Sequence, residues 1–169
     1  MTRNELEEQY FNCVLQKAAP YRHLSQDNFD LLHCGIGLTT ELLELQLSSP
    51  YSADHDKEEE LGDMLWYLTL ASAILKIHLP HIDPIVQVSR LKLIDKAERF
   101  ASLIKRHTIY GVPQSLTEPF LDLWRTFNDT IHSEGYTLDQ LRTSNIEKLN
   151  KRYKASFTPE ESQERNDKK

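Results

Sequence analysis

Residues 57–68 read KEEELGDMLWYL, a stretch in which acidic residues, a glycine and two aromatic residues share one helical pattern. Glu, Leu, Met and Trp suit an α-helix, whereas glycine in a helix interior costs about 1 kcal/mol relative to alanine. Glu60 and Asp63 are three residues apart and therefore lie on the same side of this helix, next to Gly62. A glycine at such a position lets a neighbouring helix or a ligand approach the backbone closely.

A second pair of carboxylates occurs in the preceding segment, GLTTELLELQLSS at residues 37–49. Glu41 and Glu44 are again three residues apart and share one side of a helix. If the two helices pack face to face, four carboxylates surround a small volume, which is costly unless cations neutralise them. The candidate metal ligands and catalytic groups are therefore Glu41, Glu44, Glu60 and Asp63.

This donor set favours a hard divalent cation. Mg²⁺ and Mn²⁺ prefer oxygen ligands, whereas zinc and di-iron centres usually take nitrogen donors of the kind that HxxH or ExxH motifs supply. Neither helix contains such a motif, so Mg²⁺ is the predicted cofactor and Mn²⁺ the second choice. For the neighbouring acids an alternative stays open, a solvated helix start favoured by the helix dipole: Asp54, Asp56, Glu58 and Glu59.

Apolar residues recur at helical spacing along most of the chain, and turn residues separate the segments. Few glycines and few runs of Val, Ile or Thr also weigh against extensive sheet. We predict an all-α fold, a bundle of about six helices. The predicted helices cover about residues 3–18, 27–47, 55–78, 84–107, 116–133 and 137–153.

The length of 169 residues fits one domain with a single core. We place this domain at residues 1–155, followed by a short helix and a frayed polar tail at 156–169. Two helix-start signals support these bounds: Thr137 with Gln140, and Thr158 with Pro159 and Glu161.

The net charge of −6 argues against binding of nucleic acid polymers, which needs clustered Lys and Arg. It is compatible with a nucleotide whose phosphates are bridged to carboxylates by divalent cations. No apolar run reaches the ~20 residues that span a bilayer, and the N-terminus lacks a signal peptide's apolar region, so we expect a cytoplasmic protein without a membrane partner. Cys13 and Cys34 lie in apolar settings, form no CxxC motif and are interpreted as buried free thiols.

The motifs ExxE and ExxD, separated by 15 residues within GLTTELLEL and EELGDMLWYL, resemble those of the all-helical nucleoside triphosphate pyrophosphohydrolases. This superfamily includes MazG-type enzymes, dimeric dUTPases and phosphoribosyl-ATP pyrophosphohydrolases. NIEKLNKRY at residues 145–153 resembles the NxxKLxxRY motif that closes many MazG-like domains. The resemblance implies a central four-helix metal-binding core within the bundle, and a homodimer or higher oligomer. It also implies Mg²⁺-dependent hydrolysis of a (d)NTP to NMP and pyrophosphate, with water attacking the α-phosphate.

The third motif also has a physical reading of its own. Asn145, Lys148 and Arg152 share one helical stripe, and Lys and Arg bind phosphate oxygens as a point charge and as a bidentate donor. The alternative is that basic residues gather near a helix C-terminus because of its dipole. With the resemblance, the predicted substrate-binding residues are Asn145, Lys148, Arg152, Tyr153 and Trp66.

Aromatic residues are candidates to stack on a base, although aromatics at helical spacing are more often core residues. They are Trp66, Tyr67, His33 and Trp124. The pattern does not identify the base.

The second half of the chain resembles a faded copy of the first, which suggests an internal duplication of about 27–80 and 90–153. Carboxylates are replaced there by Lys96, Arg99 and Leu121, and only Glu118 is in place. This loss leaves an alternative function open, a catalytically inactive helical nucleotide-binding or regulatory module.

Overall fold

The chain is all-helical in the computed structural model, which describes residues 12–13, 24–47, 54–83, 88–153 and 158–164. No strand occurs among these residues, which confirms the predicted all-α class. In the described part the helices are α2 (Gln26–Leu47), α3 (Asp54–Leu75), α4 (Arg90–Thr108), α5 (Thr117–Ser133), α6 (Leu138–Arg152) and α7 (Pro159–Glu164).

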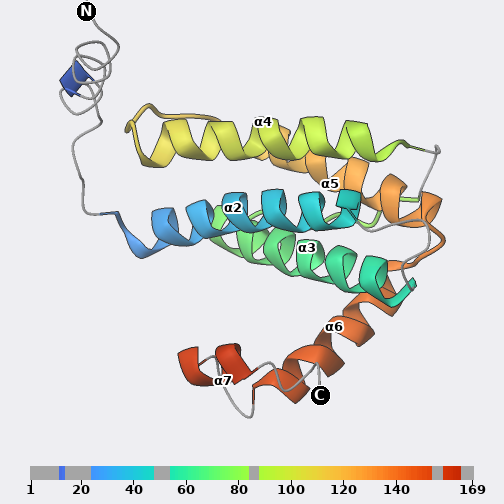
Figure 1. Cartoon of the computed structure of the whole chain (residues 1–169). Coiled ribbons are helices and arrows are strands. Elements are labelled where there is room, and N and C mark those ends of the chain that lie inside the picture. The colour runs from blue at the N-terminus through green and yellow to red at the C-terminus, as the bar shows by residue number, and fades with distance from the viewer. Residues whose placement is uncertain (1–11, 14–23, 48–53, 84–87, 154–157, 165–169) are drawn as a thin grey trace, which may run out of the picture.

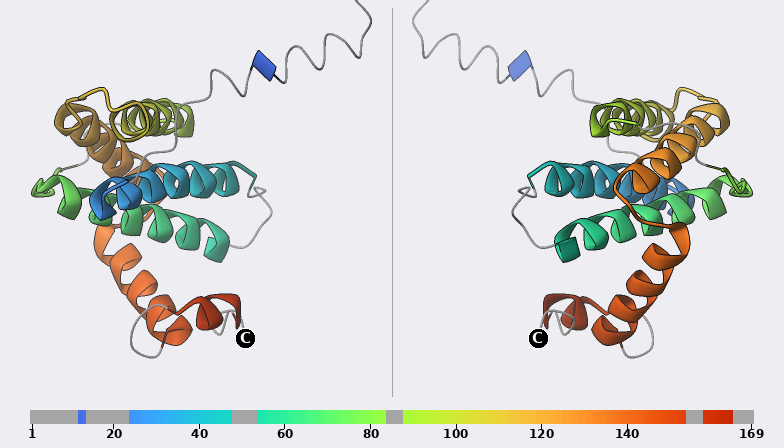
Figure 2. Two further views of the ribbon diagram at one scale, coloured as in Figure 1. Left: turned by 90° about the vertical axis from the view of Figure 1, so that its left-hand side faces the viewer. Right: turned by 90° about the vertical axis from the view of Figure 1, so that its right-hand side faces the viewer.

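Two antiparallel hairpins, α2–α3 and α4–α5, form the body of the molecule and pack together mainly through α2 and α4 (Figure 1). Helix α6 leaves this body and crosses α3 obliquely, and α7 lies beside the far end of α6 (Figure 2). Helix α3 is therefore held between α2 on one side and α6 on the other. The acidic stretch at residues 57–68 lies at this crossing.

The core fills the space between the hairpins with leucine and aromatic side chains. Trp124 is 1% exposed, and its indole Nε1 donates a hydrogen bond to the carbonyl oxygen of Pro80 at 3.0 Å. This candidate for base stacking is therefore a core residue. Other fully buried large side chains include Leu38, Leu45, Leu61, Met64, Leu68, Leu93, Phe100, Ile104, Phe120, Leu123 and Phe127.

Local signals in the sequence explain where α6 and α7 begin. The backbone N–H of Gln140 donates to Thr137 Oγ1 at 3.2 Å and that of Thr137 donates to Gln140 Oε1 at 2.8 Å, a reciprocal capping box. Helix α7 begins at Pro159, and Glu161 N donates to Thr158 Oγ1 at 3.2 Å. Both predicted helix starts are confirmed.

Two predicted helix bounds are wrong. Helix α3 ends at Leu75 rather than near residue 78, because Lys76 adopts the left-handed conformation with φ 55°. Helix α4 begins at Arg90, since Ser89 is extended with φ −75° and ψ 146°. The predicted helix at residues 3–18 lies outside the described residues, except Asn12 and Cys13, which are helical. Cys34 is buried as predicted, but Cys13 is exposed, so the prediction of a buried thiol is wrong there.

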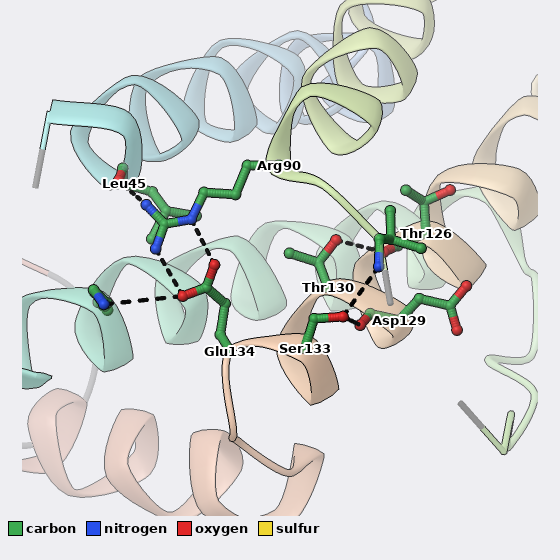
Figure 3. A network of polar contacts seen from close by, with 9 residues as sticks. Leu45, Arg90, Thr126, Asp129, Thr130, Ser133 and Glu134 are labelled. Carbon is green, nitrogen blue, oxygen red and sulfur yellow. Dashed lines mark hydrogen bonds and ion pairs between the residues drawn. The ribbon is translucent and has the colours of Figure 1, made fainter. Parts of the chain in front are cut away.

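Arg90 joins the ends of three helices in a polar network (Figure 3). Its Nε and Nη2 donate to the two carboxylate oxygens of Glu134 at 2.6 and 2.7 Å, and its Nη1 donates to the carbonyl oxygen of Leu45 at 2.8 Å. Lys57 Nζ lies 4.0 Å from the same carboxylate. The network fixes the end of the α2–α3 hairpin to the end of the α4–α5 hairpin. None of the described helices is both long and apolar enough to cross a membrane.

Candidate metal centre

Three carboxylates meet between α2 and α3. One oxygen each of Glu41, Glu60 and Asp63 can be chosen so that all three lie within 4.8 Å of one another. All three side chains are partly buried. In the described part of the chain, no other group of three His, Cys, Asp or Glu side chains meets this criterion.

Glu44, the fourth predicted ligand, is exposed and lies outside this group. Its charge nevertheless raises the pKa of both Glu41 and Glu60, so it lies at the rim of the site. Three residues along a helix correspond to a rotation about 60° short of a full turn, so Glu41 and Glu44 cannot face α3 equally.

Crowding changes the protonation of the pair formed by Glu41 and Glu60. Burial is the main cause that raises the pKa of Glu60 to about 8, and a hydrogen bond to Glu41 and the charges of Glu41, Glu44 and Glu59 add to it. Burial also raises the pKa of Glu41, while the bond from Glu60 lowers it. The two carboxyl groups therefore share a proton. A cation can take the place of that proton, and three converging carboxylate oxygens suit a hard ion such as Mg²⁺.

Helix α6 adds polar partners to the acidic stretch of α3. Lys148 Nζ forms an ion pair with Asp63 and lies 3.6 Å from Glu59 Oε1. Asn145 Nδ2 donates to Asp63 Oδ1 at 2.9 Å, and the Ser144 hydroxyl donates to Glu58. Glu58 and Glu59 are thus engaged by α6 and are more than a solvated helix start, whereas the side chains of Asp54 and Asp56 lie outside the described part.

Two glycines of the motif helices differ in what surrounds them. A Cβ on Gly62 would lie 3.4 Å from Asn145 Nδ2, so α6 approaches this backbone closely, yet the contact would be an ordinary one. A Cβ on Gly37 would lie only 2.1 Å from Cζ of Tyr67. The strict steric demand is therefore at Gly37, where the Tyr67 ring rests on α2.

Alanine substitutions at these two glycines are expected to have opposite effects. Gly62→Ala fits without a clash and replaces a poor helix former, so it should stabilise the fold by up to about 1 kcal/mol. Gly37→Ala forces the Tyr67 ring away from α2 and should cost about 1–3 kcal/mol. Urea unfolding followed by circular dichroism measures both, and equal effects of the two variants would contradict the assigned contacts.

An aromatic cluster lies one helical turn from the acids. The Tyr67 ring centroid is 5.0 Å from that of Trp66 and 5.4 Å from that of His33, both in edge-to-face geometry. Trp66 is 39% exposed and His33 is exposed, so both offer ring surface to a ligand. Burial raises the pKa of Tyr67 to about 12, with the charges of Glu41 and Asp63 adding, and the phenol stays a hydrogen-bond donor.

The end of α6 holds the remaining predicted substrate-binding residues. Arg152 is the last residue of the helix, and Tyr153 caps it through a bond from its N–H to Leu149 O at 2.8 Å. Both side chains are half-buried. Tyr153 also contributes to the raised pKa of Tyr67. Helix α6 therefore runs towards the aromatic cluster from Glu41, Glu60 and Asp63, which we call the acidic group.

The second hairpin holds an ion pair between its helices. Lys96 Nζ lies 2.8 Å from Asp122 Oδ2, a contact between α4 and α5 that the sequence analysis did not anticipate. Arg99 and Glu118 are exposed and Leu121 is half-buried. The internal duplication stays a prediction.

The raised pKa of Glu60 predicts how metal binding and stability depend on pH. Between its ordinary value of 4.5 and about 8, the folded protein holds a proton that the unfolded chain has released. Stability without metal should therefore be full below this window and fall as pH rises through it. The rise in melting temperature caused by Mg²⁺ should grow over the same range, because the ion displaces that proton.

Thermal unfolding with Mg²⁺ or EDTA across this range measures both trends. Glu60→Gln serves as the control and should flatten both, because it removes the titrating group. A Mg²⁺ effect that is independent of pH in the intact protein would argue against a proton held between Glu41 and Glu60.

The sequence matches no protein-family model, and neither the curated proteins nor the solved structures contain a significant match. The motif resemblance therefore stays an expectation. Function is inferred below from the geometry and chemistry of the site.

Proposed function

We propose that the chain is a Mg²⁺-dependent nucleoside triphosphate pyrophosphohydrolase that converts a (d)NTP to NMP and pyrophosphate. The observation that carries the proposal is the convergence of Glu41, Glu60 and Asp63 in a half-buried position. Such crowding of acids is unfavourable without a cation, and a triphosphate is a ligand that divalent cations bridge to carboxylates. The quoted motifs and the adjacent Lys148 and Asn145 support the same class, with α2–α5 as its four-helix core.

The residues present fit Mg²⁺. Glu41, Glu60 and Asp63 would supply three oxygen ligands, and the octahedral preference of Mg²⁺ leaves positions for water and phosphate oxygens. When bound, Mg²⁺ supplies positive charge that polarises the phosphate and makes a water more acidic. Mn²⁺ accepts the same oxygen donors and is the second choice.

The side chains around the three carboxylates bind the substrate and accept the proton of the attacking water. Lys148 and Arg152 bind phosphate oxygens, and Asn145 donates a hydrogen bond to phosphate or sugar. Glu44, the carboxylate outside the converging group, accepts the proton of the attacking water as general base. The water oxygen bonds to the α-phosphorus, and the bond from this phosphorus to the oxygen that bridges to the β-phosphate breaks, which releases pyrophosphate.

The aromatic cluster is assigned to the base. Trp66 has exposed ring surface, and stacking of a planar base on an aromatic side chain does not require a particular base. The rings of His33 and Tyr67 both contact the Trp66 ring in edge-to-face geometry. The proposal therefore extends to a (d)NTP and not to one base.

A second candidate function is a helical nucleotide-binding or regulatory module without turnover. The observation that favours it is Lys148, whose ammonium group pairs with Asp63 and lies 3.6 Å from Glu59. A lysine in this position already neutralises part of the acidic group without a metal. In a hydrolase, Lys148 instead exchanges this contact for the phosphates of the substrate.

Pyrophosphate release from a panel of ribo- and deoxyribonucleoside triphosphates, with Mg²⁺ or EDTA, tests the two candidates. The pyrophosphohydrolase predicts Mg²⁺-dependent release of pyrophosphate, together with the matching monophosphate. Nucleotide binding without turnover of any triphosphate would favour the binding module. Turnover to diphosphate and phosphate would contradict attack at the α-phosphorus.

A further inference from the structure

A cavity of about 400 Å³ lies where the segment after α3 meets the end of α5 and the start of α6. Each of these three parts of the chain contributes an apolar residue to its wall: Ile82, Ile131 and Leu138. At about 30 Å³ per water molecule in the liquid, the cavity has room for on the order of ten waters. That is more than an inorganic ion fills, and cavities of this size bind small organic molecules in proteins.

Hydrogen bonds hold the walls of this cavity in place. Trp124 Nε1 donates to the carbonyl oxygen of Pro80, which fixes the chain directly before His81 to α5. The capping box of Thr137 and Gln140 fixes the start of α6. A site whose walls are already fixed loses little conformational entropy when a ligand binds.

Asn128 places an unused hydrogen-bond acceptor on the buried side of the cavity. The residue is only 4% exposed, and its Nδ2 donates to the carbonyl oxygen of Trp124 at 2.8 Å. Its Oδ1 accepts no hydrogen bond from any described residue. Since no buried side-chain oxygen or nitrogen in the described part of the chain lacks a partner, Oδ1 is open to the cavity that Asn128 lines. An N–H or O–H group of a ligand satisfies this oxygen.

The rim of the cavity has more free donors than acceptors. Arg142 donates one of its five guanidinium N–H groups to Asp139 at 2.9 Å, and no described residue accepts from the other four. The His132 ring is exposed and forms no hydrogen bond with a described residue, and His81 Nε2 lies 3.4 Å from Asp83. Asp139 is the one carboxylate among the described residues that line the cavity, and Arg142 balances its charge.

We propose that this cavity binds a small organic anion, a carboxylate or a phosphate monoester, that has an N–H or O–H group at its other end. The anionic group contacts the free N–H groups of Arg142 and His132, the N–H or O–H group donates to Asn128 Oδ1, and the body of the ligand packs on the apolar wall. Carboxylate and phosphate oxygens match the excess of donors at the rim, and a guanidinium can bind either group with two parallel bonds. The proposal does not rest on the proposed function, because the cavity and the acidic group share no residue.

Titration of the full chain with matched probes, in EDTA without Mg²⁺, tests the site. Three probes combine a ring, an anionic group and a donor in the para position: para-hydroxybenzoate, the longer para-hydroxyphenylacetate and para-aminophenyl phosphate. At least one should bind with a Kd of about 1 mM or below and shift the proton–nitrogen amide signals of residues 81–82 and 137–142. Benzoate lacks the donor and para-hydroxybenzamide lacks the charge, so each should bind about fivefold more weakly than para-hydroxybenzoate, or weaker still.

Variants of the cavity separate specific binding from general attraction of an anion. Arg142→Met should weaken binding of the anionic probes about tenfold, because it removes the charged donor. Arg125→Met changes an exposed arginine of α5 outside the cavity and is the matched control, which should bind the probes as the intact protein does. Leu138→Trp should abolish binding, because the larger side chain fills the cavity.

The proposal is overturned if no probe binds the intact protein, which would mean that the cavity holds water alone. Equal losses of affinity in Arg142→Met and Arg125→Met, or para-hydroxybenzamide binding as tightly as para-hydroxybenzoate, would contradict an anion site at this rim. Amide shifts centred on Lys148 and Arg152 would place the anion beside the acidic group instead of in the cavity.

Discussion

Glu60→Gln is expected to lower Mg²⁺-dependent pyrophosphate release on the order of 10³-fold. The amide keeps the size of the side chain but removes a charge from the three carboxylates that would hold the ion, and a preorganised charge in such a site is typically worth 10²–10³ or more in rate. The fold should survive, because a neutral amide beside Glu41 relieves the crowding that raises the pKa of the Glu60 carboxyl to about 8. Loss of activity should thus accompany equal or higher stability without metal.

Three variants separate this effect from damage to the fold. Glu118→Gln removes an exposed carboxylate of the second hairpin and should leave activity unchanged. Asp63→Asn should lower both activity and stability, because it weakens the ion pair of Lys148, whose side chain is only 13% exposed. Glu44→Gln should reduce turnover while leaving the Mg²⁺-induced shift in melting temperature largely intact. If Glu60→Gln retains more than about a tenth of the wild-type kcat/KM, the assigned metal centre is wrong.

Arg90→Met is expected to lower the free energy of unfolding by about 2–4 kcal/mol. The substitution removes two charge-assisted bonds to Glu134 and the bond to the Leu45 carbonyl oxygen, and it leaves Glu134 with a side chain only 19% exposed. Glu134→Gln should cost a similar amount. The double variant should cost less than the sum, because no unpaired charge remains.

The contribution of the Arg90–Glu134 ion pair to stability depends on pH. The hydrogen bonds from Arg90 lower the pKa of Glu134 below its ordinary value of 4.5. Its contribution is full above that value and is lost as pH falls through the lower folded pKa. Intact protein and Glu134→Gln should therefore converge in stability in acid.

Arg142→Met is the control for the loss of the Arg90–Glu134 ion pair. Arg142 pairs with Asp139 at 2.9 Å, but these side chains are 52% and 91% exposed, so the loss should be below about 0.5 kcal/mol. Urea unfolding of all variants at neutral pH measures these differences. Equal losses in the free energy of unfolding for Arg90→Met and Arg142→Met would mean that the Arg90–Glu134 ion pair does not hold the two hairpins together.

The sequence predicted those features of the site that depend on one helix at a time. Helical periodicity placed Glu60 with Asp63 on one side of α3, and the start signals at Thr137 and Thr158 were confirmed. It could not decide which member of the pair Glu41 and Glu44 faces α3, because side chains three residues apart differ by about 60° around the helix. Only packing brings Glu41 into the acidic group and leaves Glu44 at the rim.

Contacts between helices distant in the sequence were the least predictable part. The ion pair from Lys148 to Asp63 joins residues 85 positions apart, and nothing in either motif indicates their distance in space. The glycine that attracted attention in the sequence, Gly62, tolerates a Cβ, whereas Gly37 does not, because the Tyr67 ring lies against it. A glycine's importance depends on what packs over it.

By itself the sequence determined the all-α class, most helix bounds and the presence of two acidic helical stripes. These follow from backbone hydrogen bonds and side-chain periodicity, which act over a few residues. The tertiary structure alone decided that Glu41, Glu60 and Asp63 converge, and that α6 places Lys148 and Asn145 beside them. Those features depend on how whole helices pack, which is a balance of buried surface and charge summed over the entire chain.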